Sequence, residues 1–255
     1  MTSEQLVAGI EGHAWEVVEE ALGARGDLLA AIEQALPRLD AEARSIAVAS
    51  VAIRGGPGAG ELLLRLTADP EAQVAAEAAT AMGKLAQVLP ADTVLAAIPD
   101  RPEPFVRGEL YKTVGRSRDA RCRPALQAAA AREQDPVAAQ WAQAALVVLG
   151  DPEARKAMLA RVAAAEPDEA LAVQDQLLYA ADSTLARGLA PWLASSLTVM
   201  RLGSDRGPPQ MARMCDLAVW IAHLLRVPSA PAPAFLDRYD EATIDRTREA
   251  LRALP

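Results

Sequence analysis

The chain has 255 residues, of which 51% are hydrophobic although only 4% are aromatic. A chain of this length can bury a sizeable core, which here would consist mostly of alanine, leucine and valine. Alanine is the best helix former, so the composition favours an all-α protein. The formal net charge of −8 argues against sequence-independent binding to nucleic acid, which requires Lys and Arg side chains that neutralise phosphates.

The termini and the cysteines indicate a compartment. The chain begins Met1-Thr2-Ser3-Glu4 without a basic start and apolar core, so no secretory signal is expected. Cys122 and Cys215 are too few and too distant for a disulfide framework or a zinc cluster. The strongly apolar run 217–225 is about half a membrane span and predicts a buried helix. We therefore expect a cytoplasmic protein without a membrane segment.

Glycines punctuate the chain at intervals of roughly 30 residues, the spacing of stacked helical repeats. Each follows an alanine-rich apolar stretch; they are Gly23, Gly55, Gly83, Gly115 and Gly150. In such stacks each unit buries its apolar face against its neighbours only. The spacing predicts a repeat protein.

Two of these stretches carry both a helix start and a helix stop. They open with Asp69-Pro70 and Asp135-Pro136 and close at Gly83 and Gly150. Aspartate is a favoured N-cap, proline is tolerated at the first helical position, and glycine readily takes the left-handed conformation beyond a helix end. These residues therefore predict helix boundaries and not ligand loops.

Extending this pattern along the chain predicts about seven antiparallel helix pairs. The first helices are predicted over 4–22, 41–54, 70–87, 103–114, 136–149, 167–181 and 209–226. Their partners are predicted over 27–36, 60–67, 91–98, 120–132, 152–164, 184–200 and 233–254. The predicted fold is an all-α, right-handed α-solenoid forming one domain over 1–255, with a loop at 203–209 before a terminal capping unit at 210–255.

The sequence resembles bacterial HEAT-repeat proteins. The matching features are the two Asp-Pro openings with their alanine-rich helices, and the run Cys215-Asp216-Leu217-Ala218 with Ile221, Ala222 and Leu225. The segment Arg238-Tyr239-Asp240 and the following helix resemble a terminal unit of such proteins. The resemblance implies a protein-binding scaffold more strongly than any reaction, although a few relatives act on bilins or damaged DNA.

Three groups of residues invite a chemical interpretation. The glycine-rich segment 54–60 lacks the Gly-Lys-Ser/Thr ending and the preceding strand of a phosphate-binding loop, so we expect a connector. Cys215 and His223 are eight residues apart on one predicted helix, about 12 Å along its axis, too far for direct proton transfer. Glu16 and Glu20 share a helix face, which predicts a solvated acidic surface. No catalytic, cofactor-binding or metal-binding residues are predicted.

The tryptophans stand in apolar helical surroundings. They are Trp15, Trp141, Trp192 and Trp220. Most are expected to fill irregularities in an alanine-rich core, and one of them could instead cap a binding groove, because tryptophan is enriched at binding hot spots. Both interpretations stay open.

Charge is unevenly distributed. Residues 1–100 carry 6 basic and 15 acidic side chains, whereas residues 116–161 carry 8 basic and 5 acidic ones. If the second helices line a concave face, five basic residues form a candidate contact for an acidic protein or peptide: Arg118, Arg121, Arg123, Lys156 and Arg161. The alternative is ordinary surface pairing with Asp119, Glu133, Asp151 and Glu153.

The expected function is thus a non-catalytic adaptor, regulator or inhibitor that binds another protein. One alternative is an enzyme or chromophore-handling protein of the bilin-lyase type, which requires a deep pocket with convergent polar residues. The other is a DNA-binding HEAT protein, which requires a basic track with interleaved aromatic residues and is disfavoured by the acidic charge balance.

Overall fold

The computed structural model describes residues 1–24, 26–85, 89–202, 210–232 and 238–254, without the side chains of 201, 202 and 210. The chain divides into two compact units, Met1–Ala145 and Leu146–Pro255. Within the described residues the only strands are two short ones in the second unit, so the predicted all-α repeat fold is confirmed. The right-handed superhelix and the single domain over 1–255 stay predictions. The predicted loop at 203–209 lies outside the described residues.

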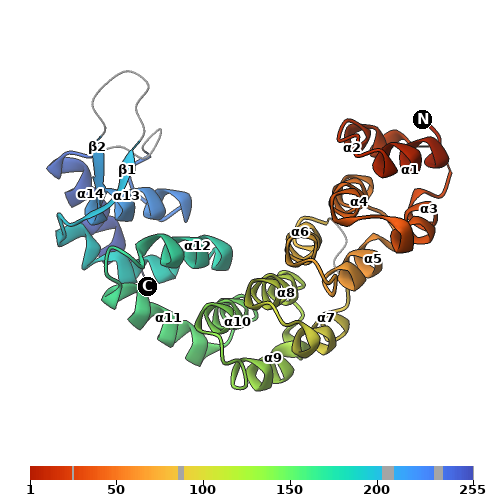
Figure 1. Ribbon diagram of the computed structural model, residues 1–255. Coiled ribbons are helices and arrows are strands. Elements are labelled where there is room, and N and C mark those ends of the chain that lie inside the picture. The colour runs from red at the N-terminus through yellow and green to blue at the C-terminus, as the bar shows by residue number, and fades with distance from the viewer. Residues whose placement is uncertain (25, 86–88, 203–209, 233–237, 255) are drawn as a thin grey trace. The chain divides into compact units, whose positions relative to one another are not determined.

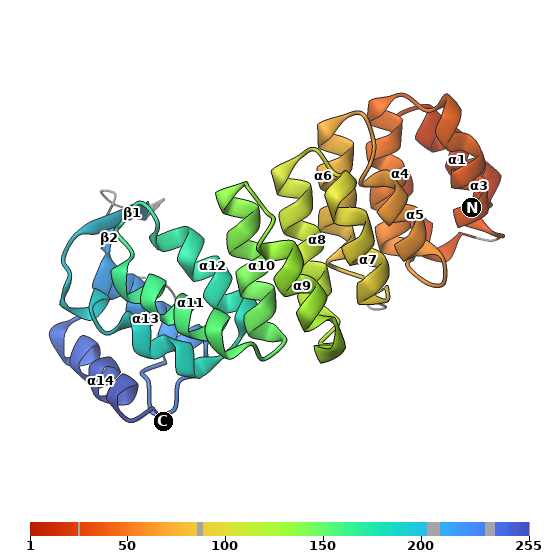
Figure 2. The same cartoon turned by 90° about the horizontal axis from the view of Figure 1, so that it is seen from below.

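The first unit consists of helices in two layers. Its α-helices are α1 (Ser3–Glu11), α2 (Val17–Glu20), α3 (Leu28–Ala35), α4 (Ala41–Arg54), α5 (Ala59–Leu66), α6 (Ala72–Met82), α7 (Ala91–Ala97), α8 (Pro104–Arg116), α9 (Arg123–Ala130) and the start of α10 (Pro136–Val148). Figure 1 shows α2, α4, α6 and α8 following one another in one layer, with α3, α5 and α7 in the other. The same two layers can be followed from below in Figure 2.

Packing changes the predicted pairing of the helices. The sequence pattern pairs α4 with α5 and α6 with α7, whereas the most extensive hairpin contacts join α5 to α6 and α7 to α8. Gly55 and Gly83 thus stand between repeat units and not between the two helices of one unit. We therefore correct the repeat frame by one helix, so that α4, α6 and α8 are second helices.

The predicted first helix, 4–22, is broken in two. Helix α1 ends at Glu11, and His13 adopts a left-handed conformation with φ of 58°. The His13 imidazole contacts the Asp40 carboxylate, with Nε2 2.9 Å from Oδ2. The chain then folds back so closely that a Cβ on Gly9 would lie 2.4 Å from the Val17 Cγ1. These local contacts outweigh the helical periodicity that predicts one continuous helix.

The small-residue faces of α6 and α10 are buried, as predicted. Ala78, Ala79, Ala142 and Ala145 are all fully buried. Their small side chains allow neighbouring backbones to approach without voids, since interiors pack at crystal-like density. The apolar stripe read from the sequence is therefore the core face.

The capping predictions are confirmed for α10 and only partly for α6. The Asp135 carboxylate accepts hydrogen bonds from the amides of Val137 and Ala138, and Gly150 has a φ of +76°. The Asp69 carboxylate instead accepts from the Glu71 amide, so α6 begins two residues later than Pro70. Gly83 is right-handed, with φ of −64°. The Asp69 carboxylate also forms an ion pair with Arg44.

The second unit contains α11 (Pro152–Ala164), α12 (Ala170–Ala180), α13 (Met214–Leu224) and α14 (Glu241–Arg252). Strands β1 (Thr198–Leu202) and β2 (Gln210–Arg213) pair antiparallel, with Met200 opposite Ala212 and an irregularity between Thr198 and Met200. The buried Asp216 carboxylate accepts hydrogen bonds from the Arg213 guanidinium and the Tyr239 amide. Burial alone would raise its pKa, but these hydrogen bonds hold it below the ordinary value.

The predicted helix over 184–200 is wrong. This segment forms two 3₁₀ helices, Ser183–Leu189 and Trp192–Ala194, followed by β1. A Cβ on Gly188 would lie 2.9 Å from the Val162 Cβ, and the Trp192 indole donates to the Val162 carbonyl at 2.7 Å. Tight docking on α11 and the helix-breaking Pro191 therefore override the apolar periodicity.

Ion pairs between an arginine and an acid about one repeat later join successive elements. The Arg44 guanidinium on α4 binds both Asp69 oxygens, at 2.7 and 3.1 Å, just before α6. In the second unit, Arg155 binds Asp182 at 3.0 Å. Arg44 also donates to the Leu39 carbonyl at 2.8 Å. Such bidentate, backbone-anchored arginines fix the register of neighbouring helices.

Removing the Arg44 charge should destabilise the first unit more than removing an exposed counterpart. Arg44→Met leaves the Asp69 carboxylate, which is 4% exposed, without its partner, and we expect a loss of about 3 kcal/mol in unfolding free energy. Arg65→Met, whose ion pair with Glu33 is more than half exposed, should cost less than about 1 kcal/mol. Urea denaturation measures both, and equal losses would contradict the role assigned to Arg44.

Candidate functional site

The five basic residues predicted as a contact surface lie in two places. Arg118 and Arg121 precede α9, and Arg123 is its first residue; α9 contacts α7, in the layer of first helices. Lys156 and Arg161 lie on α11, in the second unit. The predicted position on second helices is therefore wrong for Arg118, Arg121 and Arg123. Whether they contact a partner stays a prediction.

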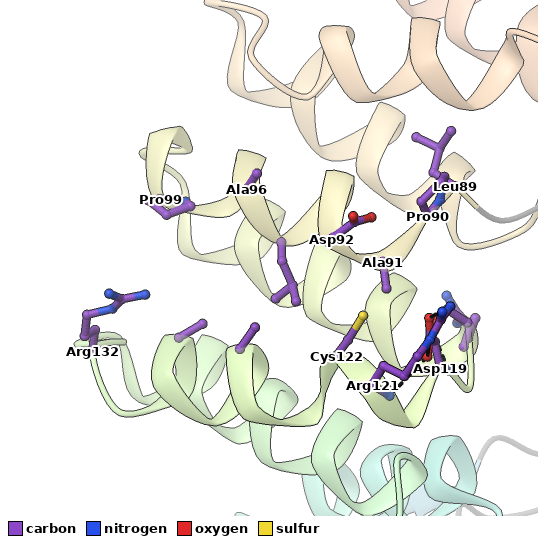
Figure 3. Close-up of a pocket in the computed structure, with 15 residues that line it drawn as sticks. Leu89, Pro90, Ala91, Asp92, Ala96, Pro99, Asp119, Arg121, Cys122 and Arg132 are labelled. Atoms are coloured by element: carbon purple, nitrogen blue, oxygen red, sulfur yellow. Dashed lines mark hydrogen bonds and ion pairs between the residues drawn. The ribbon is translucent and has the colours of Figure 1, made fainter.

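A large cavity separates α7 from α9 in the first unit. Its volume is about 1140 Å³, and Arg116, Arg121 and Arg132 line it together with Asp92 and Asp119. Figure 3 shows Arg132 at one end and the Arg121–Asp119 pair at the other. The Arg121 side chain is 90% exposed, and both of its terminal contacts go to Asp119 of its own loop, at 2.7 and 2.8 Å. This pair partly neutralises the predicted basic surface.

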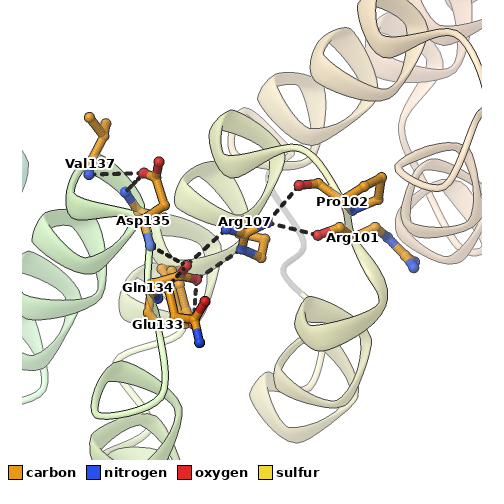
Figure 4. Close-up of polar contacts among 9 residues, drawn as sticks. Arg101, Pro102, Arg107, Glu133, Gln134, Asp135 and Val137 are labelled. Atoms are coloured by element: carbon orange, nitrogen blue, oxygen red, sulfur yellow. Dashed lines mark hydrogen bonds and ion pairs between the residues drawn. The ribbon is translucent and has the colours of Figure 1, made fainter.

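The other acids weighed against the basic surface have different partners. Glu133 accepts a bidentate hydrogen bond from Arg107, at 2.8 and 2.9 Å, and Asp151 caps α11 through the Ala154 amide. Figure 4 shows Arg107 spread between Glu133 and the carbonyls of Arg101 and Pro102. The hydrogen bond from Arg107 holds the pKa of the Glu133 carboxyl below its ordinary value. Surface pairing with Asp119 thus accounts for Arg121, and Arg161 donates to the Gln176 side chain.

A second cavity, which the sequence does not predict, lies on the layer of second helices. This α4–α6 groove has a volume of about 750 Å³. Its alanine-rich floor comes from the facing sides of α4 and α6 and comprises Val48, Ala49, Ala52, Ala76 and Ala81, with Ser45, Gln73, Glu77, Thr80 and Lys84 among them. The side chains on these sides of α4 and α6 are mostly small, so they leave a depression in the surface.

Three large apolar side chains border the α4–α6 groove and remain exposed. Trp15, just before α2, is 49% exposed, Ile53 near the end of α4 is 45% exposed, and Phe105 at the start of α8 is 55% exposed. The first unit has only three other strongly exposed large hydrophobic side chains among its described residues: Met1, Leu22 and Val137. Clusters of exposed apolar side chains in a hollow are typical of interaction surfaces.

The tryptophans divide between the two interpretations left open by the sequence. Trp192 is buried and serves as core, whereas Trp15 borders the groove. Lys112 lies over the Trp141 ring, 4.5 Å from its centroid. The sequence alone does not place Trp15 at the groove, because its position depends on the fold-back at Gly9.

The rare nucleophiles do not come together with a base. Cys215 is buried, and His223 contacts the Trp220 ring with centroids 5.9 Å apart. Cys122 lines the α7–α9 cavity between Asp92 and Asp119. Burial, followed by these two carboxylates, raises the pKa of the Cys122 thiol. Within the described residues, no group of three or more His, Cys, Asp and Glu side chains could hold a metal ion.

No helix in the described part of the chain is both long enough and apolar enough to cross a membrane.

Antiparallel helix pairs stacked in two layers define a helical-repeat protein. Residues 59–147 match the family model described as HEAT repeats, from the first residue of α5 to the penultimate residue of α10. This segment of the chain therefore contains HEAT repeats. The match begins with α5, in agreement with the corrected repeat frame. No curated protein and no solved structure matches the chain.

Both thiols should react slowly in the native protein. At pH 8 the raised pKa values of Cys122 and Cys215 leave few thiolates, and burial further restricts access to Cys215. In a Cys215→Ser variant, Asp92→Asn should speed labelling of Cys122 at low salt, because one charge that disfavours its thiolate is gone. Labelling with an aromatic disulfide reagent measures the rate. A native rate equal to that of the urea-unfolded chain would contradict the prediction.

Proposed function

We propose that this protein is a non-catalytic scaffold that binds another protein through the α4–α6 groove. HEAT repeats generally mediate protein–protein interaction. The observation that carries the proposal is the border of Trp15, Ile53 and Phe105 around a hollow of about 750 Å³. Aromatic side chains at the edge of an apolar depression are the composition of binding hot spots.

The groove is better suited to a protein than to a small reactant. Its floor is mostly alanine and valine, and polar side chains are scattered along it without converging on one point. The bilin-lyase alternative would require convergent polar residues in a deep pocket. A DNA-binding role would require a basic track, whereas Lys84 is the one basic residue among the described side chains that line this groove. Adaptor, regulator and inhibitor are forms of the proposed binding role.

The five basic residues are kept as second proposed contacts for an acidic protein or peptide, with Arg118, Arg121 and Arg123 in the first unit and Lys156 and Arg161 in the second. Their support is the exposure of Arg118 and Lys156. A cytoplasmic location is likewise proposed, on the two free cysteines.

Truncating the border of the groove should weaken partner binding about tenfold without unfolding the protein. The tagged full chain is purified from its native host as parent, as a Trp15→Ser/Phe105→Ser variant, and as a Leu22→Ser control. Leu22 is equally apolar and exposed but does not line the groove. We expect one stoichiometric protein with parent and control, and about tenfold less with the double variant. Melting temperatures should stay close to the parent's, since the changed side chains are exposed.

The competing results are specific. Undiminished recovery with the double variant would exclude this groove as the contact. Loss of the partner on Arg121→Glu/Lys156→Glu, with the groove variant still binding, would move the contact to the basic surface. A copurifying pigment or nucleic acid in place of a protein would refute the scaffold role.

A further inference from the structure

The charged side chains around the α4–α6 groove are sorted by sign. Glu16, Glu71 and Glu103 are the N-cap residues of α2, α6 and α8, and all three are exposed. Arg54 is the last residue of α4, and Lys84 follows the end of α6. Because these helices form one layer, carboxylates mark its N-terminal edge, and cations mark its C-terminal edge at α4 and α6; α2 is the exception, because it ends in Glu19 and Glu20. We call these the acidic edge and the basic edge.

The described part of the chain leaves these five charges without an ion pair. Among the described residues, the ion pairs involve none of the three acidic-edge carboxylates, nor Arg54 or Lys84. The helix dipoles favour the same sorting, since anions are stabilised at helix N-termini and cations at C-termini. The separated charges produce an electrostatic field across the groove, from the basic edge to the acidic edge.

The backbone chemistry of the groove selects the conformation of its occupant. Helices satisfy their own N–H and C=O groups, so the groove offers no strand edge with which an extended peptide could pair. An extended segment would bury unpaired backbone groups against alanine and valine, which is costly. A helix buries only side chains. Its diameter of about 10 Å is smaller than the length of α4 or α6, so it can lie across both helices between the two edges.

From this geometry we infer that the occupant is a single amphipathic helix of the partner, with basic side chains along one flank and acidic side chains along the other. It lies across α4 and α6, and its apolar face contacts Trp15 and Phe105 at opposite ends. Passing from α2 to α8 covers three interaxial spacings of about 8–10 Å each, or roughly 16–20 helical residues. Its basic flank faces the acidic edge and its acidic flank faces the basic edge. This inference rests on the proposed function and specifies the partner's chemistry.

Synthetic helices of about 18 residues test the inference directly. Three peptides share one leucine face and differ in their flanks: Lys on one and Glu on the other, Lys on both, or Glu on both. A fourth keeps the split flanks but replaces the leucines with serine. Fluorescence anisotropy of labelled peptides with the full-length protein measures binding at low and at physiological salt. We expect the split-flank peptide to bind about tenfold more tightly than either single-charge peptide, and the serine-faced peptide not to bind.

Charge reversal provides the decisive control. Glu71→Lys/Glu103→Lys replaces two of the three carboxylates of the acidic edge with cations, so the peptide with Glu on both flanks should become the preferred ligand. Glu4→Lys/Glu61→Lys is the matched variant, because these exposed glutamates also lie in the first turns of their helices, α1 and α5, outside the layer that bears the groove. It should leave the order of the peptides unchanged.

Failure of the inference is distinguishable from failure of the proposed function. Equal binding of the three leucine-faced peptides, binding of none, or an unchanged order after Glu71→Lys/Glu103→Lys would overturn the split-flank helix. If the native partner is still lost on Trp15→Ser/Phe105→Ser, the groove remains the contact and only its occupant's chemistry is wrong. If the native partner is retained, the groove itself is wrong.

Discussion

The bidentate ion pair between Arg44 and Asp69 is the constraint on which the α4–α6 groove depends. It joins the first turn of α4 to the loop that precedes α6, and Arg44 also anchors the Leu39 carbonyl. A buried ion pair contributes less stability than its Coulomb energy, because both charges lose water. Its geometric effect is larger, since a planar guanidinium holds a carboxylate in one orientation. Arg107 and Glu133 repeat the arrangement between α8 and the loop before α10.

Alanine-rich packing explains why a groove forms on this layer. Ala78 and Ala79 allow α6 to approach its neighbours, while Ala76 and Ala81 line the α4–α6 groove. Small side chains satisfy the core and leave the outer face hollow. The few large side chains, Trp15 and Phe105, come from helix starts where no neighbour covers them. Close packing and an apolar binding surface therefore follow from the same residue choice.

Local signals predict helices well and the candidate site poorly, for a physical reason. The predicted ranges 41–54 and 152–164 coincide with α4 and α11, because their capping aspartates and periodic apolar residues act within one helix. Gly83 marks a helix end but does not indicate which neighbour that helix packs against. The repeat frame predicted from the sequence is therefore off by one helix. The 3₁₀ helix Ser183–Leu189, which replaces a predicted α-helix, docks through Gly188 against Val162, which is a nonlocal contact. Exposure of Trp15 depends on a fold-back at Gly9 in the same way.

The polarity of the helices links the fold to the recognition we infer. The second helices of the repeat units, α4, α6 and α8, point the same way. The positive ends of their dipoles therefore lie at one edge of the layer and the negative ends at the other. Acidic N-caps such as Glu71 and basic residues such as Lys84 counter those partial charges locally, yet they project further into solvent than the backbone does. A ligand helix therefore meets full side-chain charges before it meets the dipoles. Because the edges differ in sign, a split-flank helix fits in one direction only, and orientation is specified without any sequence-specific polar contact in the groove floor.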